Sequence, residues 1–310
     1  MKTVTKKQET EIVKKYFEQS KSSIELSKEY GFSPVTICKI LKRNGLNARD
    51  RTQSNRRYSI KEDYFDNIDT QEKAYIMGLL YADGYNDTSR NSVNLSLKES
   101  DKQILEDITK IIQPEKPLQF VKVNKDNCEN HYRLVMANRH ISQKIAEYGC
   151  IKAKTFSVEF PNWLDEELQS HFIRGYIDGD GWIGKKSICI VGTEKFLDKI
   201  SEICYSKFGF NTYKRKRHKH RNHNIFMLDF SGRKKCSQFL DWIYKDAMIF
   251  LERKKNASLN LKQIYTESSS GIDASGDGSS SNASLVSPSL NEEFNKKSKV
   301  YILKDDFRFL

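Results

Sequence analysis

The sequence lacks the cysteine spacings that build metal clusters or disulfide frameworks. Its six cysteines are scattered along the chain, and no two of them form a CxxC pair. It also lacks an apolar run long enough to span a bilayer, and an N-terminal apolar segment of the kind found in signal peptides. We therefore expect reduced, mostly buried thiols in a cytoplasmic protein that has no membrane partner.

Acidic residues are too few to balance the basic ones. The chain has 53 Lys and Arg against 41 Asp and Glu, a net charge of +12. An excess of this size suggests a polyanionic partner, most often nucleic acid, although a charge that serves only solubility is the simpler alternative. Residues 1–57 alone hold fourteen basic and six acidic residues, a net charge of +8, so the imbalance is concentrated near the N-terminus.

The basic N-terminal segment has the pattern of three short helices, expected at 8–19, 22–31 and 33–45. The third has an N-cap at Ser33 and a proline at the first helical position, and it ends at Gly45. Two short helices joined by a glycine-containing turn indicate a helix-turn-helix. We expect the third helix to contact DNA, although a plain three-helix bundle with a solvated basic face is the alternative. Its outward residues are Thr36, Lys39, Lys42 and Arg43.

From about residue 67 the order of expected elements repeats. Each half reads as α-β-β-α-β-β-α, which predicts an α+β fold with two pseudo-symmetric halves and antiparallel sheets. After residue 265 the chain becomes rich in Ser, Gly, Asp and Asn and poor in apolar groups. The expected segments are a helix-turn-helix domain at 1–47, a basic linker at 48–66, halves at 67–160 and 161–265, and a low-complexity linker with a C-terminal tail at 266–310.

Each half begins with a similar nine-residue motif, "IMGLLYADG" at 76–84 and "IRGYIDGDG" at 173–181. Small residues four apart, Gly78 with Ala82 and Gly175 with Gly179, put a narrow stripe on one face of each helix. Such stripes let two helices approach until their backbones touch. We therefore expect the two motif helices to pack together, with the glycines that close the motifs acting as left-handed C-caps.

The packed motif helices would bring Asp83 and Asp180 together at one end. Two adjacent carboxylates at the negative ends of helix dipoles repel each other, and a divalent cation removes that conflict. In a basic protein, such a pair indicates metal-assisted phosphodiester hydrolysis. Taken alone, "DGDG" would fit a calcium loop or a turn equally well. The sixth motif position differs between the copies, being Tyr81 in the first and Asp178 in the second.

One hairpin, "YKRKRHKHRNH" at 213–223, is strongly basic on both faces. A β-ribbon with arginines and lysines suits guanine edges and phosphates in the DNA major groove, although a solvated hairpin tip is the simpler alternative. Its histidines are expected to contact phosphate or solvent rather than metal. The expected DNA contacts are Arg215, Arg217, Lys219 and Arg221.

With these motifs, residues 67–265 resemble the LAGLIDADG homing endonuclease family in its single-chain, two-motif form. The resemblance rests on both motifs, the order of the elements between them, and the context "YGCIKAKTFSVEFP" before the second motif. It implies that Asp83 and Asp180 are catalytic acids that bind metal, and that the carbonyls of Ala82 and Gly179 contact the metal. It further implies basic active-site residues at Lys154 and Lys254, with Arg253 as the alternative to Lys254.

The resemblance implies a site-specific double-strand DNA endonuclease that requires Mg²⁺, with Mn²⁺ as a substitute. Its partner would be a long asymmetric duplex DNA site, bound by a monomer whose helix-turn-helix adds contacts. Two alternatives stay open. One is an RNA maturase that assists intron splicing, and the other is a DNA-binding regulator that does not cleave.

Overall fold

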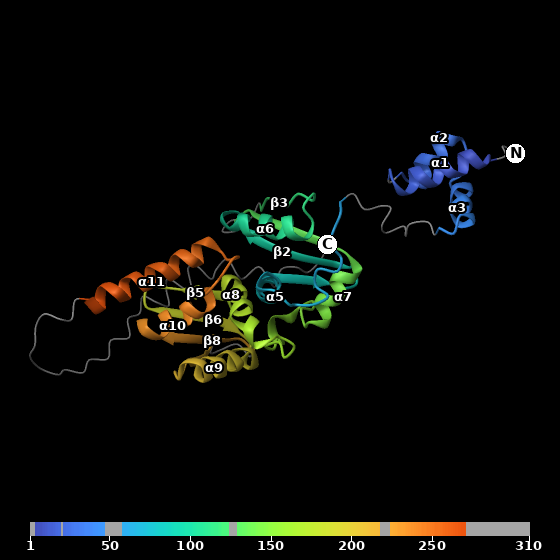
Figure 1. Ribbon diagram of the computed structural model, residues 1–310. Helices are drawn as coiled ribbons and strands as arrows, with labels where there is room; N and C mark the ends of the chain where they lie inside the picture. Colours follow the sequence, from blue (N-terminus) through green and yellow to red (C-terminus); the bar gives the residue numbers. More distant parts are fainter. Residues whose placement is uncertain (1–3, 20, 47–57, 124–128, 218–223, 271–310) are drawn as a thin grey trace, which may run out of the picture. The chain divides into compact units, whose positions relative to one another are not determined.

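The computed structural model describes residues 4–19, 21–46, 58–123, 129–217 and 224–270 (Figure 1). The chain separates into two compact units, residues 1–59 and 60–310. Among the described residues, no helix combines the length and hydrophobicity that a membrane span requires. Cys38, Cys150, Cys189, Cys204 and Cys236 are free thiols, and all but Cys38 are buried.

The described residues of the N-terminal unit form three helices, α1 (Lys6–Phe17), α2 (Ser23–Tyr30) and α3 (Pro34–Arg43). Apolar residues at helical spacing from all three helices form a core of its own, separate from that of the second unit. Its fully or nearly fully buried members are Ile12, Tyr16, Leu26, Ile37, Ile40 and Leu41. Burial of these side chains therefore stabilises the N-terminal unit independently of the second unit.

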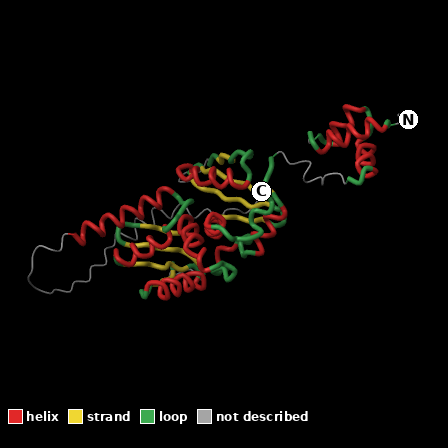
Figure 2. Tube along the Cα trace, viewed as in Figure 1, coloured by secondary structure: helices red, strands yellow, loops and turns green. Residues whose placement is uncertain are grey.

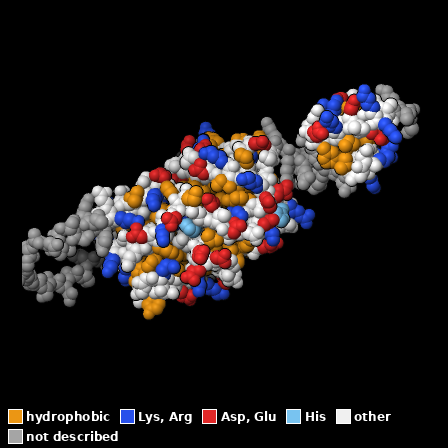
Figure 3. Space-filling view, in the orientation of Figure 1, with side chains coloured by type: hydrophobic (Ala, Val, Ile, Leu, Met, Phe, Trp, Pro, Cys, Tyr) orange, Lys and Arg blue, Asp and Glu red, His pale blue; other side chains and the backbone are white. Residues whose placement is uncertain are grey.

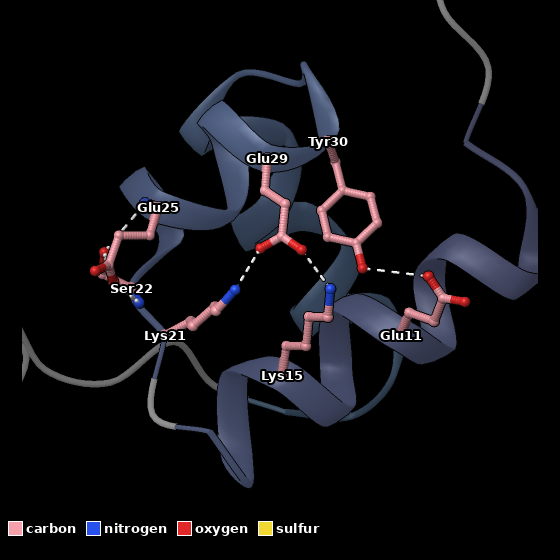
Figure 4. Close-up of polar contacts among 7 residues, drawn as sticks. All are labelled: Glu11, Lys15, Lys21, Ser22, Glu25, Glu29 and Tyr30. Carbon is pink, nitrogen blue, oxygen red and sulfur yellow. Dashed lines mark hydrogen bonds and ion pairs between the residues drawn. The ribbon is translucent and has the colours of Figure 1, made fainter.

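Side-chain caps fix where these helices begin and end. Ser22 and Glu25 form a capping box at the start of α2, in which the Ser22 N–H and hydroxyl both donate to the Glu25 carboxylate at 2.8 Å (Figure 4). The predicted cap of α3 is confirmed, because the Ser33 hydroxyl accepts the Thr36 N–H at 3.1 Å and Pro34 follows it. Gly31 ends α2 in the left-handed conformation, with φ of 68°.

Polar contacts also join α1 to α2. The Glu29 carboxylate accepts hydrogen bonds from Lys15 on α1 and from Lys21 at 2.6 Å, and the Tyr30 hydroxyl donates to Glu11 at 3.2 Å (Figure 4). The hydrogen bond from Lys15 holds the pKa of Glu29 below its ordinary value. These groups are solvent-accessible, so their pairing orients the helices more than it stabilises them.

The second unit repeats one order of elements. Its first half contains α5 (Gln71–Asp83), β1 (Gly84–Asp87), β2 (Ser92–Lys98), α6 (Lys102–Ile112), β3 (Gln119–Val121), β4 (His131–Ala137) and α7 (Arg139–Glu147). Its second half contains α8 (Gln169–Asp180), β5 (Gly181–Ile183), β6 (Ser187–Gly192), α9 (Glu194–Phe208), β7 (Tyr213–Lys216), β8 (Phe226–Ser231) and α10 (Arg233–Tyr244). The predicted α-β-β-α-β-β-α order of each half is confirmed. Short 3-10 turns η1 (Glu99–Asp101), η2 (Lys154–Phe156) and η3 (Glu166–Leu168) connect elements.

Each half builds one four-stranded antiparallel sheet, with strand order β1-β2-β4-β3 in the first and β5-β6-β8-β7 in the second. Figure 2 shows the strands of each sheet in yellow with helices packed along them. Along β2, Val93, Leu95 and Leu97 are buried, and the residues between them are half-exposed. This alternation places one face of the sheet against helices and leaves the other face open.

One further helix, α11 (Glu252–Ser270), follows the second half and packs against α10 and β5. The sequence analysis predicted no helix here. The helix begins directly after the buried Leu251, and Leu261 lies in the common core. Its position matters because it carries Lys254 in its first turn.

Candidate active site

The two motif helices, α5 and α8, pack together at backbone contact in the centre of the second unit (Figure 1). A β-carbon on Gly78 would lie 2.0 Å from the carbonyl oxygen of Phe172, and one on Gly175 would lie 2.0 Å from that of Tyr75. No side chain fits at either distance, because the obstructing atoms are backbone. The predicted contact face of the helices is therefore confirmed, and it explains why both glycines occur inside helices.

The contact is reciprocal. Gly78 faces the Phe172 carbonyl and the Tyr176 nitrogen, and Gly175 faces the Tyr75 carbonyl and the Leu79 nitrogen. The motifs are 97 residues apart, and adding 97 to the α5 residue of the first set while subtracting 97 from its α8 residues gives the second set. The two motif helices are thus related by an approximate twofold axis that passes between them.

The C-terminal ends of α5 and α8 lie against each other. A β-carbon on Gly179 would be 2.4 Å from the Ala82 β-carbon and 2.7 Å from the Asp83 Oδ2 atom. The Asp83 carboxylate therefore touches the last turn of α8, which ends at Asp180. Both aspartates are half-exposed, whereas the residues before them in the motifs are buried. The two acids are accessible from solvent at one end of the helix pair.

The glycines that close the two motifs, Gly84 and Gly181, do not have the predicted left-handed conformation. Gly84 has φ of −73° and Gly181 has φ of −107°, so both are extended and neither is a left-handed cap. Steric contact explains them instead, because an added β-carbon would lie 2.5 Å from the Leu80 carbonyl oxygen at Gly84 and 2.7 Å from that of Ile177 at Gly181. The chain passes straight from each motif helix into the first strand of its sheet.

Two buried lysines lie at these closing glycines in equivalent positions. The Lys154 ammonium donates to the Gly84 carbonyl, and the Lys254 ammonium donates to the Gly181 carbonyl and, at 3.2 Å, to that of Ile177. Burial, with the nearby Arg253 charge, lowers the pKa of Lys254 to about 8. One lysine therefore marks the end of each motif helix.

Arg253, the alternative to Lys254, is directed elsewhere. Its guanidinium pairs with the Asp101 carboxylate, with Nε 2.9 Å from each carboxylate oxygen. This pair ties α11 to η1 in the first half. The geometry therefore distinguishes the two adjacent basic residues, which the sequence did not.

The donor set at the helix ends fits a hard divalent cation. It offers the carboxylates of Asp83 and Asp180 and the carbonyl oxygens of the last helical turns, all of them oxygen ligands. Among the described residues, no cluster of three or more His, Cys, Asp or Glu side chains is arranged to hold a metal. A pair of carboxylates is the set through which Mg²⁺ is commonly bound together with a substrate phosphate and water.

The basic side chains of β7 (Tyr213–Lys216) and its extension point alternately to the two faces of the second sheet. Arg215 lies on the open face and pairs with Asp229 on β8 at 2.8 Å, and Arg217 continues the same ladder through a bond from its N–H to the Ile225 carbonyl at 3.1 Å. Lys214 points the other way and pairs with Glu194 and Asp198 on α9. The predicted contacts Lys219 and Arg221 lie outside the described residues.

The open face of the first sheet carries polar side chains that the sequence analysis did not single out. Asn94 and Ser96 alternate with the buried residues of β2, and the Arg133 guanidinium on β4 donates to the Ser96 hydroxyl at 3.0 Å. Gln119 on β3 lies opposite Arg133. The alternation of polar and apolar residues in "SVNLSLK" could have predicted this polar face. It was overlooked because the segment has no run of charged residues.

The predicted contacts on α3 are not equivalent. Lys39 and Lys42 are exposed, whereas Thr36 is half-buried and its hydroxyl hydrogen-bonds to that of Ser33 at 2.9 Å. Arg43 is exposed but pairs with Glu9 at 3.1 Å. Figure 3 shows Lys and Arg side chains around an apolar area on the visible face of this unit. Of the four predicted DNA contacts, Lys39 and Lys42 are therefore the most accessible to a phosphate.

One protein family matches part of the second half of the chain. The match, over residues 167–244, is to the LAGLIDADG-like domain and includes α8 to α10. No curated protein sequence matches the chain.

Several solved structures are similar to the chain at low identity. Full-length DUF199/WhiA from Thermatoga maritima is 15% identical with a TM-score of 0.43, over 78% of this chain and 72% of that one. The meganuclease I-SmaMI bound to uncleavable DNA is 11% identical with a TM-score of 0.43, over 76% and 97%. The LAGLIDADG homing endonuclease I-LtrWI bound to target DNA is 13% identical with a TM-score of 0.43, over 77% and 98%. Similarity at this level does not assign a function to the chain.

Proposed function

We propose that the protein is a divalent-metal-dependent endonuclease that cleaves both strands of a specific DNA site. The observation that carries the proposal is the clustering of two accessible aspartates and two buried lysines at the ends of the paired motif helices. The net charge of +12 and the open polar sheet faces support DNA as the substrate.

The residues divide the chemistry between them. Asp83 and Asp180, with the carbonyls of Ala82 and Gly179, would hold Mg²⁺ or Mn²⁺, which when bound polarises a phosphate and activates a water. Lys154 and Lys254 each place an ammonium at the end of one motif helix, where it stabilises negative charge that develops on the phosphate. A lysine with a pKa of about 8 can also exchange a proton near neutral pH.

Two surfaces outside this centre support recognition of a long site. The open faces of the two sheets carry Arg133 and Arg215 among polar neighbours, a composition that suits base edges and phosphates. In the N-terminal unit, Lys39 and Lys42 on α3 would add phosphate contacts in the manner of a helix-turn-helix. The two units would then contact separate stretches of one duplex.

The test uses a plasmid that carries the sequence flanking the gene, joined as it would be without an insertion. We expect linearisation with Mg²⁺ or Mn²⁺, none with EDTA, and loss of double-strand cleavage in Asp83→Asn and Asp180→Asn with binding retained. Either variant cleaving like the wild type would refute the assigned acids. Tight binding by the wild type without cleavage, in any divalent metal, would indicate the DNA-binding regulator instead.

A further inference from the structure

The sixth motif residues, Tyr81 and Asp178, form a second set of related contacts across the helix pair. The Tyr75 hydroxyl on α5 donates to the Asp178 carboxylate on α8 at 2.8 Å. At the positions offset by 97 residues, the Phe172 ring on α8 packs edge to face on Tyr81 of α5, with centroids 5.0 Å apart. The same two sites on the helices therefore hold a polar pair in one half and an aromatic pair in the other.

The polar pair holds the chain that leads to Lys254. The Asp178 Oδ2 atom also accepts the Leu251 N–H at 2.8 Å, and the Leu251 carbonyl accepts the N–H of Lys254 at 3.0 Å in the first turn of α11. One turn earlier on α8, the Arg174 Nε donates to the Ile249 carbonyl at 3.1 Å. Asp178 thus accepts a hydrogen bond from the residue directly before the helix that carries the lysine.

The aromatic pair holds the chain that leads to Lys154. The Tyr81 hydroxyl donates to the Tyr148 carbonyl, and the Trp163 indole donates to the same oxygen at 3.1 Å. Asn86 on β1 then donates to the Cys150 carbonyl at 2.9 Å. Both sixth-position residues therefore bond to backbone upstream of a lysine, Tyr81 as a donor at Tyr148 and Asp178 as an acceptor at Leu251.

Asp178 is poorly suited to direct contact with a metal or with DNA. It is 1% exposed, and its Oδ2 atom already accepts two hydrogen bonds. Tyr81 is buried as well. Their arrangement suits a role in holding other groups, and each holds the segment of only one lysine.

Building on the endonuclease proposed above, we propose that Asp178 with Tyr75 positions Lys254, that Tyr81 positions Lys154, and that each set serves the cleavage of one DNA strand. Because the two sets belong to different lysines, a defect in one slows one strand and spares the other. The sixth motif position would then set the balance between the two strand cleavages and would not contact substrate.

The experiment follows the two strands of one duplex target, each labelled separately, in single-turnover cleavage. Lys254→Met and Lys154→Met first identify which strand depends on which lysine. We expect Tyr75→Phe and Asp178→Asn to slow the Lys254-dependent strand by roughly 10-fold, and Tyr81→Phe to slow the Lys154-dependent strand similarly. The other strand and the dissociation constant for DNA should change less than about twofold, since none of these residues faces the substrate.

Thr109→Val is the matched control, because it removes a buried hydroxyl on α6 that donates only to its own helix at the Leu105 carbonyl. It should leave the strand balance unchanged, and thermal denaturation should show all variants folded. Equal slowing of both strands, slowing of the opposite strand, or no slowing would each overturn the positioning role. A wild type that cleaves neither strand would instead refute the proposed endonuclease, and this role with it.

Discussion

At the scale of single residues, Gly175, like Gly78, has no room for a side chain. An added β-carbon would lie 2.0 Å from the Tyr75 carbonyl and 2.9 Å from the Leu79 nitrogen, both backbone atoms that cannot move independently of α5. We expect Gly175→Ala to lower the free energy of unfolding by about 2 kcal/mol or more, because overpacking outweighs the roughly 1 kcal/mol gain in helix propensity. Denaturant unfolding measures the change.

Gly209→Ala is the control for that substitution. Gly209 has φ of +69° but no atom within 4 Å of an added β-carbon. Its replacement should cost about 1 kcal/mol from backbone strain alone. A Gly175→Ala protein as stable as the wild type would show that the helices are not in backbone contact.

Lys254 should make stability depend on alkaline pH. Its pKa is about 8 in the folded protein, below the ordinary 10.5, because burial disfavours the charge. Between these values the unfolded chain binds the proton that the folded protein has released, so stability rises with pH across this window. From pH 7 to pH 10, the free energy of unfolding should rise by roughly 2 kcal/mol more in the wild type than in Lys254→Met. Chemical denaturation at both pH values tests this, and a difference that does not vary with pH would contradict it.

At the scale of elements, the first turn of α11 carries two basic residues with different tasks. Arg253 pairs with Asp101, a carboxylate only 5% exposed, and Lys254 reaches the Gly181 carbonyl. We expect Arg253→Gln to destabilise the protein by about 1 to 3 kcal/mol, since it leaves Asp101 with a weaker partner. Cleavage at a temperature well below unfolding should persist, whereas Lys254→Gln should lose cleavage of one strand.

Melting curves and cleavage rates of the two variants separate these tasks. If Arg253→Gln lost cleavage while folded and Lys254→Gln kept it, the assignment of the two residues would be reversed. The outcome is informative because the side chains are adjacent and similar in charge.

The regular elements of the two halves, α11 excepted, were predictable because their sequence periods are strong. The small-residue stripes of α5 and α8 and the alternation in β2 each correspond to a face that the structure buries. The conformation of Gly84 was not predictable. A glycine after a helix fits a left-handed cap equally well, and only the approach of the Leu80 backbone shows why a side chain is excluded.

The second active-site lysine could not be assigned from the sequence either. The motifs are 97 residues apart and Lys154 and Lys254 are 100 apart, so spacing alone did not separate Lys254 from Arg253. The tether from Asp178 to the Leu251 N–H joins residues 73 positions apart in sequence. Such contacts follow from tertiary packing and leave no local pattern.

At the scale of the whole molecule, the charge of the N-terminal unit should govern how binding depends on salt. Lys39 and Lys42 are exposed on α3, and a lysine that no longer neutralises its phosphate lowers the salt slope by about 0.9. We expect a double substitution of both by alanine to weaken DNA binding and to reduce the slope of log K against log salt by about 2. Fluorescence anisotropy over a salt series measures it.

Lys7 and Lys14 on α1 are exposed lysines of the same unit and provide the matched pair. Their double alanine variant has the same net charge but should keep most of the slope, because the expected contact runs through α3. Equal reductions of the slope in the two variants would mean that the unit acts through its total charge and not through one helix.

The pairing of Tyr75 with Asp178 disfavours the association of two second halves. The glycine face of each motif helix is its own complement, so backbone contact alone would let two first halves or two second halves join. Two second halves, however, would set Asp178 against Phe172, a ring with no hydroxyl to donate, and would bury the carboxylate without that partner. The hydroxyl of Tyr75 thus favours the unlike pair over a pair of two second halves, because only the unlike pair gives the buried Asp178 carboxylate this donor.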